Sequence, residues 1–145
     1  MKPLPLEPAF RGRSVLITGH TGFKGSWLAL WLGHLGAKVT GYALAAPTTP
    51  SHFAVSGVRE MLAGHFEADI RDAGRVADVV AGADPEVIFH LAAQALVRES
   101  YAHPRETFDT NVMGTVNLLE AVWRRGKTCA VAASQRRRGD ATGAA

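Results

Sequence analysis

Three glycines near the amino terminus have the spacing of a phosphate-binding loop, in the string Gly19-His-Thr-Gly22-Phe-Lys-Gly25. Gly19 would allow a tight turn, Gly22 would let the backbone approach a diphosphate, and Gly25 would let a following helix pack close to a sheet. The first amide groups and the positive end of such a helix attract phosphate. Because ordinary turns also use glycine, the pattern indicates a dinucleotide site when it lies between a strand and a helix.

The sequence around this loop predicts alternating strands and helices. An apolar, β-branched run at 14–18 precedes the glycines, as in a buried parallel strand. Four further strands are predicted, at 38–43, 65–68, 86–92 and 128–133. Strands that alternate with helices favour a parallel sheet with right-handed crossovers. The predicted fold class is therefore α/β, a doubly wound parallel sheet of about five strands with helices on both faces.

Helix signals separate the predicted strands. Asp72 is placed to cap a helix, and Gly36 and Gly126 are placed to end two others. The first helix is predicted to have the apolar face Leu28, Trp31, Leu32 and Leu35. The Asp72 helix is predicted to have the apolar face Val76, Val79 and Val80. The longest helix, predicted over 107–125, has on one side Phe108, Val112, Val116, Leu119 and Val122 or Trp123.

Composition excludes several classes of protein. The single cysteine, Cys129, cannot build a disulfide scaffold or a cysteine-based zinc site. The longest apolar run, at 27–32, is too short to span a bilayer, and the amino terminus lacks the apolar segment of a signal peptide. The histidines have no metal-ligand spacing. We therefore expect a cytoplasmic protein with no membrane partner and no metal.

The net charge of +3 arises at one end of the chain. Six of the 16 basic residues lie between Arg124 and Arg138, and the other ten are outnumbered by 13 acidic residues. No aromatic residue alternates with those arginines, as a stacking site for bases would require. This charge pattern is typical of a solvated tail, so we expect no nucleic-acid partner.

The glycine loop and three later segments resemble the extended, sugar-nucleotide-modifying branch of the short-chain dehydrogenase/reductases, the NAD-dependent epimerases and dehydratases. The three segments are Asp69-Ile70, His90-Leu-Ala-Ala-Gln94 and Asn111-Val-Met-Gly-Thr115. The strings 18–27 and 92–101 resemble in particular the amino-terminal portion of the CDP-glucose 4,6-dehydratases. Taken singly, each segment also has a plain structural explanation. The aspartate could be a helix cap, the alanines could serve close packing, and the asparagine could be a polar residue that faces water. Four segments in the family's order favour the functional interpretation.

The resemblance implies an NAD site built from these segments. In the family, the aspartate bonds the adenine amino group, the next apolar side chain packs on the ring, and small residues after the fourth strand line the passage to the nicotinamide ribose. The residues so implied for the cofactor are Gly19, Thr21, Gly22, Phe23, Lys24, Gly25, Asp69, Ile70, Leu91, Ala92, Ala93, Gln94 and Asn111. Those that either face the sugar nucleotide or form a plain loop are Arg98, Ser100 and Tyr101.

The resemblance also implies a redox-neutral lyase that converts CDP-glucose to CDP-4-keto-6-deoxyglucose. Bound NAD would take hydride from C4 of the hexose, water would leave across C5 and C6, and the hydride would return to C6. The family's acid/base chemistry needs Tyr-x-x-x-Lys, but here Tyr42 is followed by Ala46 and Tyr101 by Arg105. Of the family's Thr-Ser-Asp-Lys motif only Ser134 matches. We therefore assign no catalytic residue and expect the chain to be inactive by itself.

Two other functions and the choice of cofactor remain open from the sequence. The chain could be a catalytically silent NAD(H)-binding regulatory module, or an epimerase or reductase of the same branch. The stretch 42–46 supplies neither the acid that selects NAD nor the arginine that selects NADP, so the preference for NAD comes from the resemblance. Family members form homodimers through two helices, the long helix at 107–125 and the helix that carries the tyrosine of Tyr-x-x-x-Lys. The second helix is absent from this sequence, so its partner surface on the first would be left uncovered. We therefore expect uncovered apolar surface and aggregation.

The expected organisation has three parts. Residues 1–12 form an amino-terminal extension, 13–134 an incomplete NAD-binding Rossmann-type domain, and 135–145 an unstructured basic tail. The family resemblance stops at the end of the last predicted strand, directly after Ser134, where a string rich in Arg, Gly and Ala begins. A shifted reading frame produces such a change, and we expect another frame of the DNA to encode Ser-Asp-Lys at this point.

Overall fold

Five parallel strands form the sheet in the computed structural model, which describes residues 6–134. The strands are β1 (Ser14–Thr18), β2 (Lys38–Ala43), β3 (Gly64–Glu67), β4 (Val87–His90) and β5 (Ala130–Ala133). Their order across the sheet is β3-β2-β1-β4-β5, and every neighbouring pair is parallel. This confirms the predicted doubly wound α/β class and the bounds predicted for the first two strands. The tail predicted at 135–145 lies outside the described residues.

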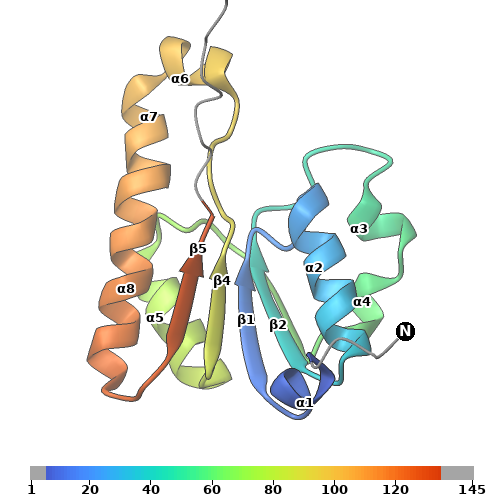
Figure 1. Cartoon of the computed structure of the whole chain (residues 1–145). Helices are drawn as coiled ribbons and strands as arrows, with labels where there is room; N and C mark the ends of the chain where they lie inside the picture. Colours follow the sequence, from blue (N-terminus) through green and yellow to red (C-terminus); the bar gives the residue numbers. More distant parts are fainter. Residues whose placement is uncertain (1–5, 135–145) are drawn as a thin grey trace, which may run out of the picture.

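Helices cover both faces of the sheet, as predicted (Figure 1). One side carries α2 (Phe23–His34), with α3 (His52–Val55) and α4 (Val58–Met61), and the other carries α5 (Ala73–Ala83) and α8 (Gly114–Arg125). The remaining helices are α1 (Glu7–Phe10), α6 (Val97–Ala102), α7 (Pro104–Phe108) and a π-helical turn, η1 (Asp109–Met113). The short helices α1, α3 and α4 were not predicted.

The first strand shows why the sheet needs helices on both faces. Leu16 packs into a cluster with Val76 and other residues of α5 and α8, whereas Val15 and Ile17 pack into a second cluster around α2. Alternate side chains of a strand point to opposite faces, so an apolar run without alternation is buried on both. All three residues are at most 1% exposed. The strand that carries the glycine loop is therefore anchored from both sides.

The capping predictions for the helices are confirmed. The Asp72 carboxylate accepts a hydrogen bond from the Arg75 amide, and Val76, Val79 and Val80 of α5 are buried. Gly36 and Gly126 follow α2 and α8 with φ values of 81° and 70°, a left-handed conformation that favours glycine.

The predicted apolar face of α2 is wrong in part. Trp31 is 49% exposed, and the buried residues of the helix are Gly25, Ser26, Ala29 and Leu32. Small side chains at three of these positions let the helix lie close to the sheet. The bulky Trp27 and Trp31 therefore point outward, where packing density does not limit them.

The strand predicted at 86–92 is shorter than expected. It ends at His90, and residues 91–96 run without regular structure. The reason is a side chain, because the Thr18 hydroxyl oxygen lies 3.1 Å from the amide nitrogens of both Leu91 and Ala92. The Leu91 amide also donates to the Thr18 carbonyl oxygen at 3.0 Å, which is the last bond of the ladder to β1, whereas the Ala92 amide donates to the Thr18 hydroxyl. The third strand begins one residue early, at Gly64, and the fifth two residues late, at Ala130.

The long helix predicted at 107–125 is interrupted by η1, and much of its apolar surface is uncovered. Gly114, Leu118 and Ala121 of α8 face the core. The large apolar side chains of the predicted side are at least 44% exposed at Phe108, Val112, Val116, Leu119 and Trp123. The edge strand β5 is exposed along its length. Within residues 6–134, none of the helices is long and apolar enough to cross a membrane.

Candidate functional site

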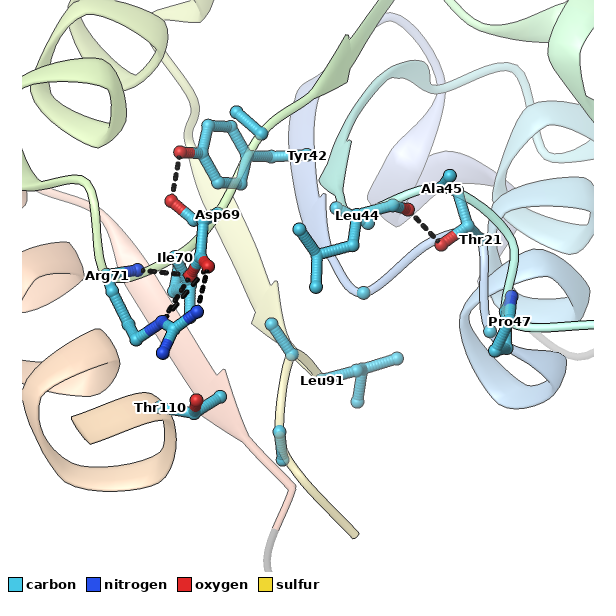
Figure 2. A pocket seen from close by; sticks show the side chains of 16 residues that line it. Thr21, Tyr42, Leu44, Ala45, Pro47, Asp69, Ile70, Arg71, Leu91 and Thr110 are labelled. Atoms are coloured by element: carbon cyan, nitrogen blue, oxygen red, sulfur yellow. Dashed lines mark hydrogen bonds and ion pairs between the residues drawn. The ribbon is translucent and has the colours of Figure 1, made fainter. Parts of the chain in front are cut away.

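A pocket of about 270 Å³ opens at the carboxyl ends of β1 to β4 (Figure 2). Strand order reverses direction between β1 and β4, and in open α/β sheets ligands bind at such a switch point. The residues that line the pocket are Gly19, Thr21, Gly22, Tyr42, Ala43, Leu44, Ala45, Pro47, Ala68, Asp69, Ile70, Arg71, Leu91, Ala92, Ala93 and Thr110. The pocket is thus built by four strand ends that lie far apart in the sequence.

The glycine loop forms the floor of the pocket and leaves no room for larger residues. Gly19 has φ of 78°, and a Cβ there would lie 2.8 Å from the amide nitrogen of Ala92. A Cβ on Gly25 would lie 2.2 Å from the carbonyl oxygen of Gly19. Gly22 is the N-cap of α2, and no side chain caps the helix there. The uncapped amides at this helix start are suited to a diphosphate.

One wall of the pocket is formed by Asp69 and its neighbours. The guanidinium and the amide of Arg71 donate to the Asp69 carboxylate, which holds the pKa of that carboxyl below its usual value. Tyr42 donates from its hydroxyl to the Asp69 carbonyl oxygen at 2.7 Å. Burial raises the pKa of Tyr42 to about 12, so this hydroxyl stays protonated. Figure 2 shows both residues converging on Asp69.

Ile70 is held in this wall from the side of α8. Its side chain is 5% exposed, and a Cβ on Gly114 would lie 2.7 Å from Ile70 Cγ2. The Asn117 side-chain amide donates to the carbonyl oxygens of Ile70 and Arg71, each at 3.1 Å. The glycine in the segment 111–115 is therefore explained by the close approach of α8 to the pocket wall.

The opposite wall consists of residues 91–94, which we call the 91–94 wall. The Thr18 hydroxyl accepts from the Leu91 and Ala92 amides at its start. At its end the Asn111 side chain pairs with the Gln94 backbone, accepting from the amide at 2.8 Å and donating to the carbonyl at 3.1 Å. Asn111 lies in η1, and π-turns are frequent at functional sites. The wall is irregular in backbone but fixed at both ends.

His20 lies beneath the glycine loop and is fully buried. Its Nε2 is 2.8 Å from His65 Nδ1, and its ring contacts Phe53 edge-on at 5.3 Å between centroids. Burial, helped by the proximity of His65, lowers the pKa of His20 to about 4. A Cβ on Gly41 of β2 would lie 2.3 Å from the imidazole. His20 therefore serves loop packing, and residue 41 must be glycine to leave room for its imidazole.

The predicted cofactor residues fall into two groups in the structure. Eight line the pocket: Gly19, Thr21, Gly22, Asp69, Ile70, Leu91, Ala92 and Ala93. Of the other five, Gly25 packs under the loop, Gln94 and Asn111 pair behind the wall, and Phe23 and Lys24 have exposed side chains at the start of α2. The backbone amides of those last two belong to the uncapped start of α2, where a phosphate would bind.

The residues suggested for the sugar nucleotide lie beyond the pocket. Arg98, Ser100 and Tyr101 belong to α6, which follows the 91–94 wall, and none of them lines the pocket. Tyr101 is 81% exposed. Ser134 ends the described chain with its amide bonded to the His90 carbonyl oxygen at 3.0 Å.

Sequence reasoning missed half of the lining. The missed residues are Tyr42, Ala43, Leu44, Ala45, Pro47, Ala68, Arg71 and Thr110. Seven of them lie at or just after the ends of β2 and β3, and the rule that ligands bind at the carboxyl ends of parallel strands would have found them. Thr110 has no such signal, because it reaches the pocket through the π-turn. Among residues 6–134 no group of three His, Cys, Asp or Glu side chains is arranged to hold a metal ion.

Comparison with known proteins gives a consistent picture. Residues 16–135 match the family model described as GDP-mannose 4,6 dehydratase. The CDP-glucose 4,6-dehydratase of Salmonella typhimurium is 52% identical over 122 residues, which cover 84% of this chain and 34% of that protein. The crystal structure of a UDP-glucose 4-epimerase from Brucella ovis in complex with NAD aligns with a TM-score of 0.67 and 32% identity, covering 79% of this chain and 33% of that one.

A second solved structure agrees with the first. The UDP-glucose-4-epimerase from Stenotrophomonas maltophila, with bound NAD and formylated UDP-arabinopyranose, aligns with a TM-score of 0.68 and 29% identity. The alignment covers 79% of this chain and 34% of the epimerase. The chain thus spans about a third of the length of the proteins that it matches.

Proposed function

The chain belongs to the GDP-mannose 4,6-dehydratase family, and from this premise we propose that it is the NAD-binding portion of a sugar-nucleotide 4,6-dehydratase that acts on CDP-glucose. The observation that carries the proposal is the pocket itself. It joins a glycine loop that has no room for a side chain at Gly19 or Gly25, an uncapped helix start, and the Asp69–Ile70 wall at one switch point. The CDP-glucose assignment comes from the 52% identity to the Salmonella typhimurium enzyme.

The residues present fit a dinucleotide. The amides that follow Gly22 would hold the diphosphate, the Asp69 carboxylate would accept from the adenine amino group, and Ile70 would pack on the ring. The amide, Nε and Nη2 of Arg71 give the Asp69 carboxylate three donors against about four lone-pair sites, so one site would remain for the adenine amino group. The small side chains of Ala92 and Ala93 would leave the passage to the second ribose open. Bound NAD would supply hydride transfer, taking hydride from C4 of the hexose and returning it to C6.

A filled pocket tests this function. Ala93 lines the pocket but has an exposed side chain, so Ala93→Trp would occupy the site without entering the core. We expect the unmodified chain to bind NAD in calorimetric titration and Ala93→Trp to lose at least tenfold in affinity. Ala81→Trp, at an exposed position on α5, is the matched control and should bind as the unmodified chain does. No NAD binding by the unmodified chain would contradict the proposal.

A catalytically silent NAD(H)-binding module is the second candidate. It is supported by one observation, that the residues suggested for the sugar nucleotide, Arg98, Ser100 and Tyr101, lie on α6 and do not line the pocket. An epimerase of the same family would share the cofactor site, and the identity to a dehydratase weighs against it. Turnover of CDP-glucose separates an enzyme from a silent module.

A further inference from the structure

Thr18, His90 and Thr115 form a chain of hydrogen bonds behind the pocket. Thr18 Oγ1 lies 2.7 Å from His90 Nδ1, and His90 Nε2 lies 3.0 Å from Thr115 Oγ1. The Thr115 hydroxyl in turn lies 2.8 Å from the carbonyl oxygen of Asn111. Thr18 and His90 are 1% and 5% exposed, so water cannot replace these partners. This series of hydrogen bonds runs from the end of β1, through the end of β4, to the π-turn.

The direction of each bond follows from counting donors and acceptors. Thr18 Oγ1 accepts from the Ala92 amide and shares the Leu91 amide with its own backbone carbonyl, so its proton is left to donate to His90 Nδ1. Nδ1 therefore carries no proton, and Nε2–H donates to Thr115. The Thr115 hydroxyl then donates to the Asn111 carbonyl oxygen. In the opposite tautomer, with the proton on Nδ1, Nε2 would be an acceptor. The Thr115 hydroxyl has one proton, which would then bond to Nε2 and would no longer bond to the Asn111 carbonyl oxygen.

The two ends of this series of hydrogen bonds both bind the 91–94 wall. Thr18 directly precedes Gly19 and binds the start of the 91–94 wall. Asn111, at the other end, holds the backbone of Gln94 with two hydrogen bonds. The imidazole thus connects the glycine loop to the π-turn and, through it, both ends of the same wall. A buried network in which every member is satisfied makes such a connection rigid.

We propose that His90, as the neutral Nε2–H tautomer, is a positioning residue that sets the spacing between the glycine loop and the 91–94 wall for a bound dinucleotide. This role rests on the proposed function, because it presupposes a dinucleotide in the pocket. An imidazolium could not replace the neutral ring, since its Nδ1–H would face an oxygen whose lone pairs are already engaged. The burial of His90 lowers its pKa, in agreement with a neutral ring.

The unmodified chain and two variants test the role. Nitrogen NMR of the unmodified chain should show His90 Nδ1 without a proton and Nε2 with one. Thr115→Val keeps the shape of the side chain but removes its acceptor and donor, whereas Thr115→Ser keeps both. We expect at least a tenfold loss of hydrogen-exchange protection at the Gln94 amide in Thr115→Val, unchanged protection in β2, and recovery in Thr115→Ser. NAD affinity should follow the same order, with at least a tenfold loss.

Three results would overturn the role: a proton on Nδ1, Gln94 protection in Thr115→Val equal to that of the unmodified chain, or NAD affinity unchanged by that substitution. The NMR and exchange measurements need no cofactor. A chain that fails to bind NAD would overturn the proposed function, while these two measurements would still decide whether the histidine holds the wall. Loss of protection throughout β2 as well would mean general unfolding and would also count against a positioning role.

Discussion

Gly19 is the residue at which backbone conformation and close approach coincide. An alanine there would have to adopt φ of 78° with its Cβ 2.8 Å from backbone atoms of Leu91 and Ala92. The ends of β1 and β4 are paired within the sheet, so neither can move away to relieve this contact. We expect Gly19→Ala to lower the free energy of unfolding by about 2–4 kcal/mol, measured by urea denaturation, and to abolish NAD binding.

Gly82 is the matched control for that substitution. It lies in α5, is exposed, and has enough open space around it that an added Cβ would meet no atom within 4 Å. Gly82→Ala should raise the free energy of unfolding by about 0.5–1 kcal/mol, because alanine loses less conformational entropy in a helix. Equal effects of the two substitutions would refute the steric account of the glycine loop.

His20 predicts how stability depends on pH. Its pKa is about 4 in the folded chain against an ordinary value of 6.5. Between pH 6.5 and 4 the unfolded chain therefore binds a proton that the folded chain does not bind. Stability contributed by the neutral ring is therefore complete above pH 6.5 and is lost as the pH falls to 4, by about 3 kcal/mol in all. The lowered pKa of His90 acts in the same direction.

Urea denaturation between pH 4 and 7 measures this effect. His20→Gln should show a shallower fall in stability over that range, with the contribution of His90 remaining. His34→Gln, at an exposed position at the end of α2, is the matched control and should follow the unmodified chain. A fall of the same steepness in His20→Gln would show that the buried His20 imidazole does not control the acid sensitivity.

At the scale of elements, the sequence predicted what local pattern determines and missed what distant side chains determine. β1 and β2 were predicted to the residue, because their apolar runs are buried on both faces and bounded by turns. The end of β4 was not, because the Thr18 hydroxyl, 74 residues away in sequence, binds the Ala92 amide. The outward tryptophans of α2 and the π-turn likewise reflect close packing, which periodicity does not report.

The same limit applies to the candidate site. The glycine loop and Asp69 carry recognisable patterns, so half of the pocket lining could be predicted. The ends of β2 and β3 have no motif and become pocket residues only through strand order. Thr110 depends on the register of a helix that is interrupted by η1. Strand order and helix register arise from the whole fold, and one segment of sequence does not contain them.

The exposed apolar surface of α8 predicts self-association. Val116, Leu119 and Trp123 are 44%, 47% and 79% exposed and recur at helical spacing. We expect the unmodified chain to sediment as concentration-dependent, heterogeneous oligomers, and Leu119→Glu with Trp123→Lys to shift it toward a monomer. Val55→Glu, which removes an apolar side chain that is 73% exposed on α3, should leave the oligomers unchanged. A clean monomer of the unmodified chain would contradict this prediction.

At the scale of the whole molecule, the cofactor pocket and the uncovered surfaces lie on different parts of one sheet. The pocket is lined mainly by residues at the ends of β1 to β4, whereas β5 and the outer side of α8 are exposed. The suggested substrate residues Arg98, Ser100 and Tyr101 belong to α6, which lies with α7 at the top of Figure 1, away from the sheet. We therefore expect cofactor binding to be separable from the chemistry that a dehydratase performs on its sugar.

That separation leads to the last prediction, which concerns turnover. The purified chain should bind NAD yet give no detectable 4-keto-6-deoxy sugar from CDP-glucose, measured by the absorbance of the keto sugar. Loss of a general base alone lowers the rate by about 10²–10⁴, and here the tyrosine, its lysine and the Asp-Lys of the strand-five motif are all missing from the sequence. The full-length Salmonella typhimurium CDP-glucose 4,6-dehydratase, assayed in parallel, is the positive control. Product at or above the molar amount of the chain would show that other residues supply the acid/base chemistry, and would overturn the expectation of inactivity.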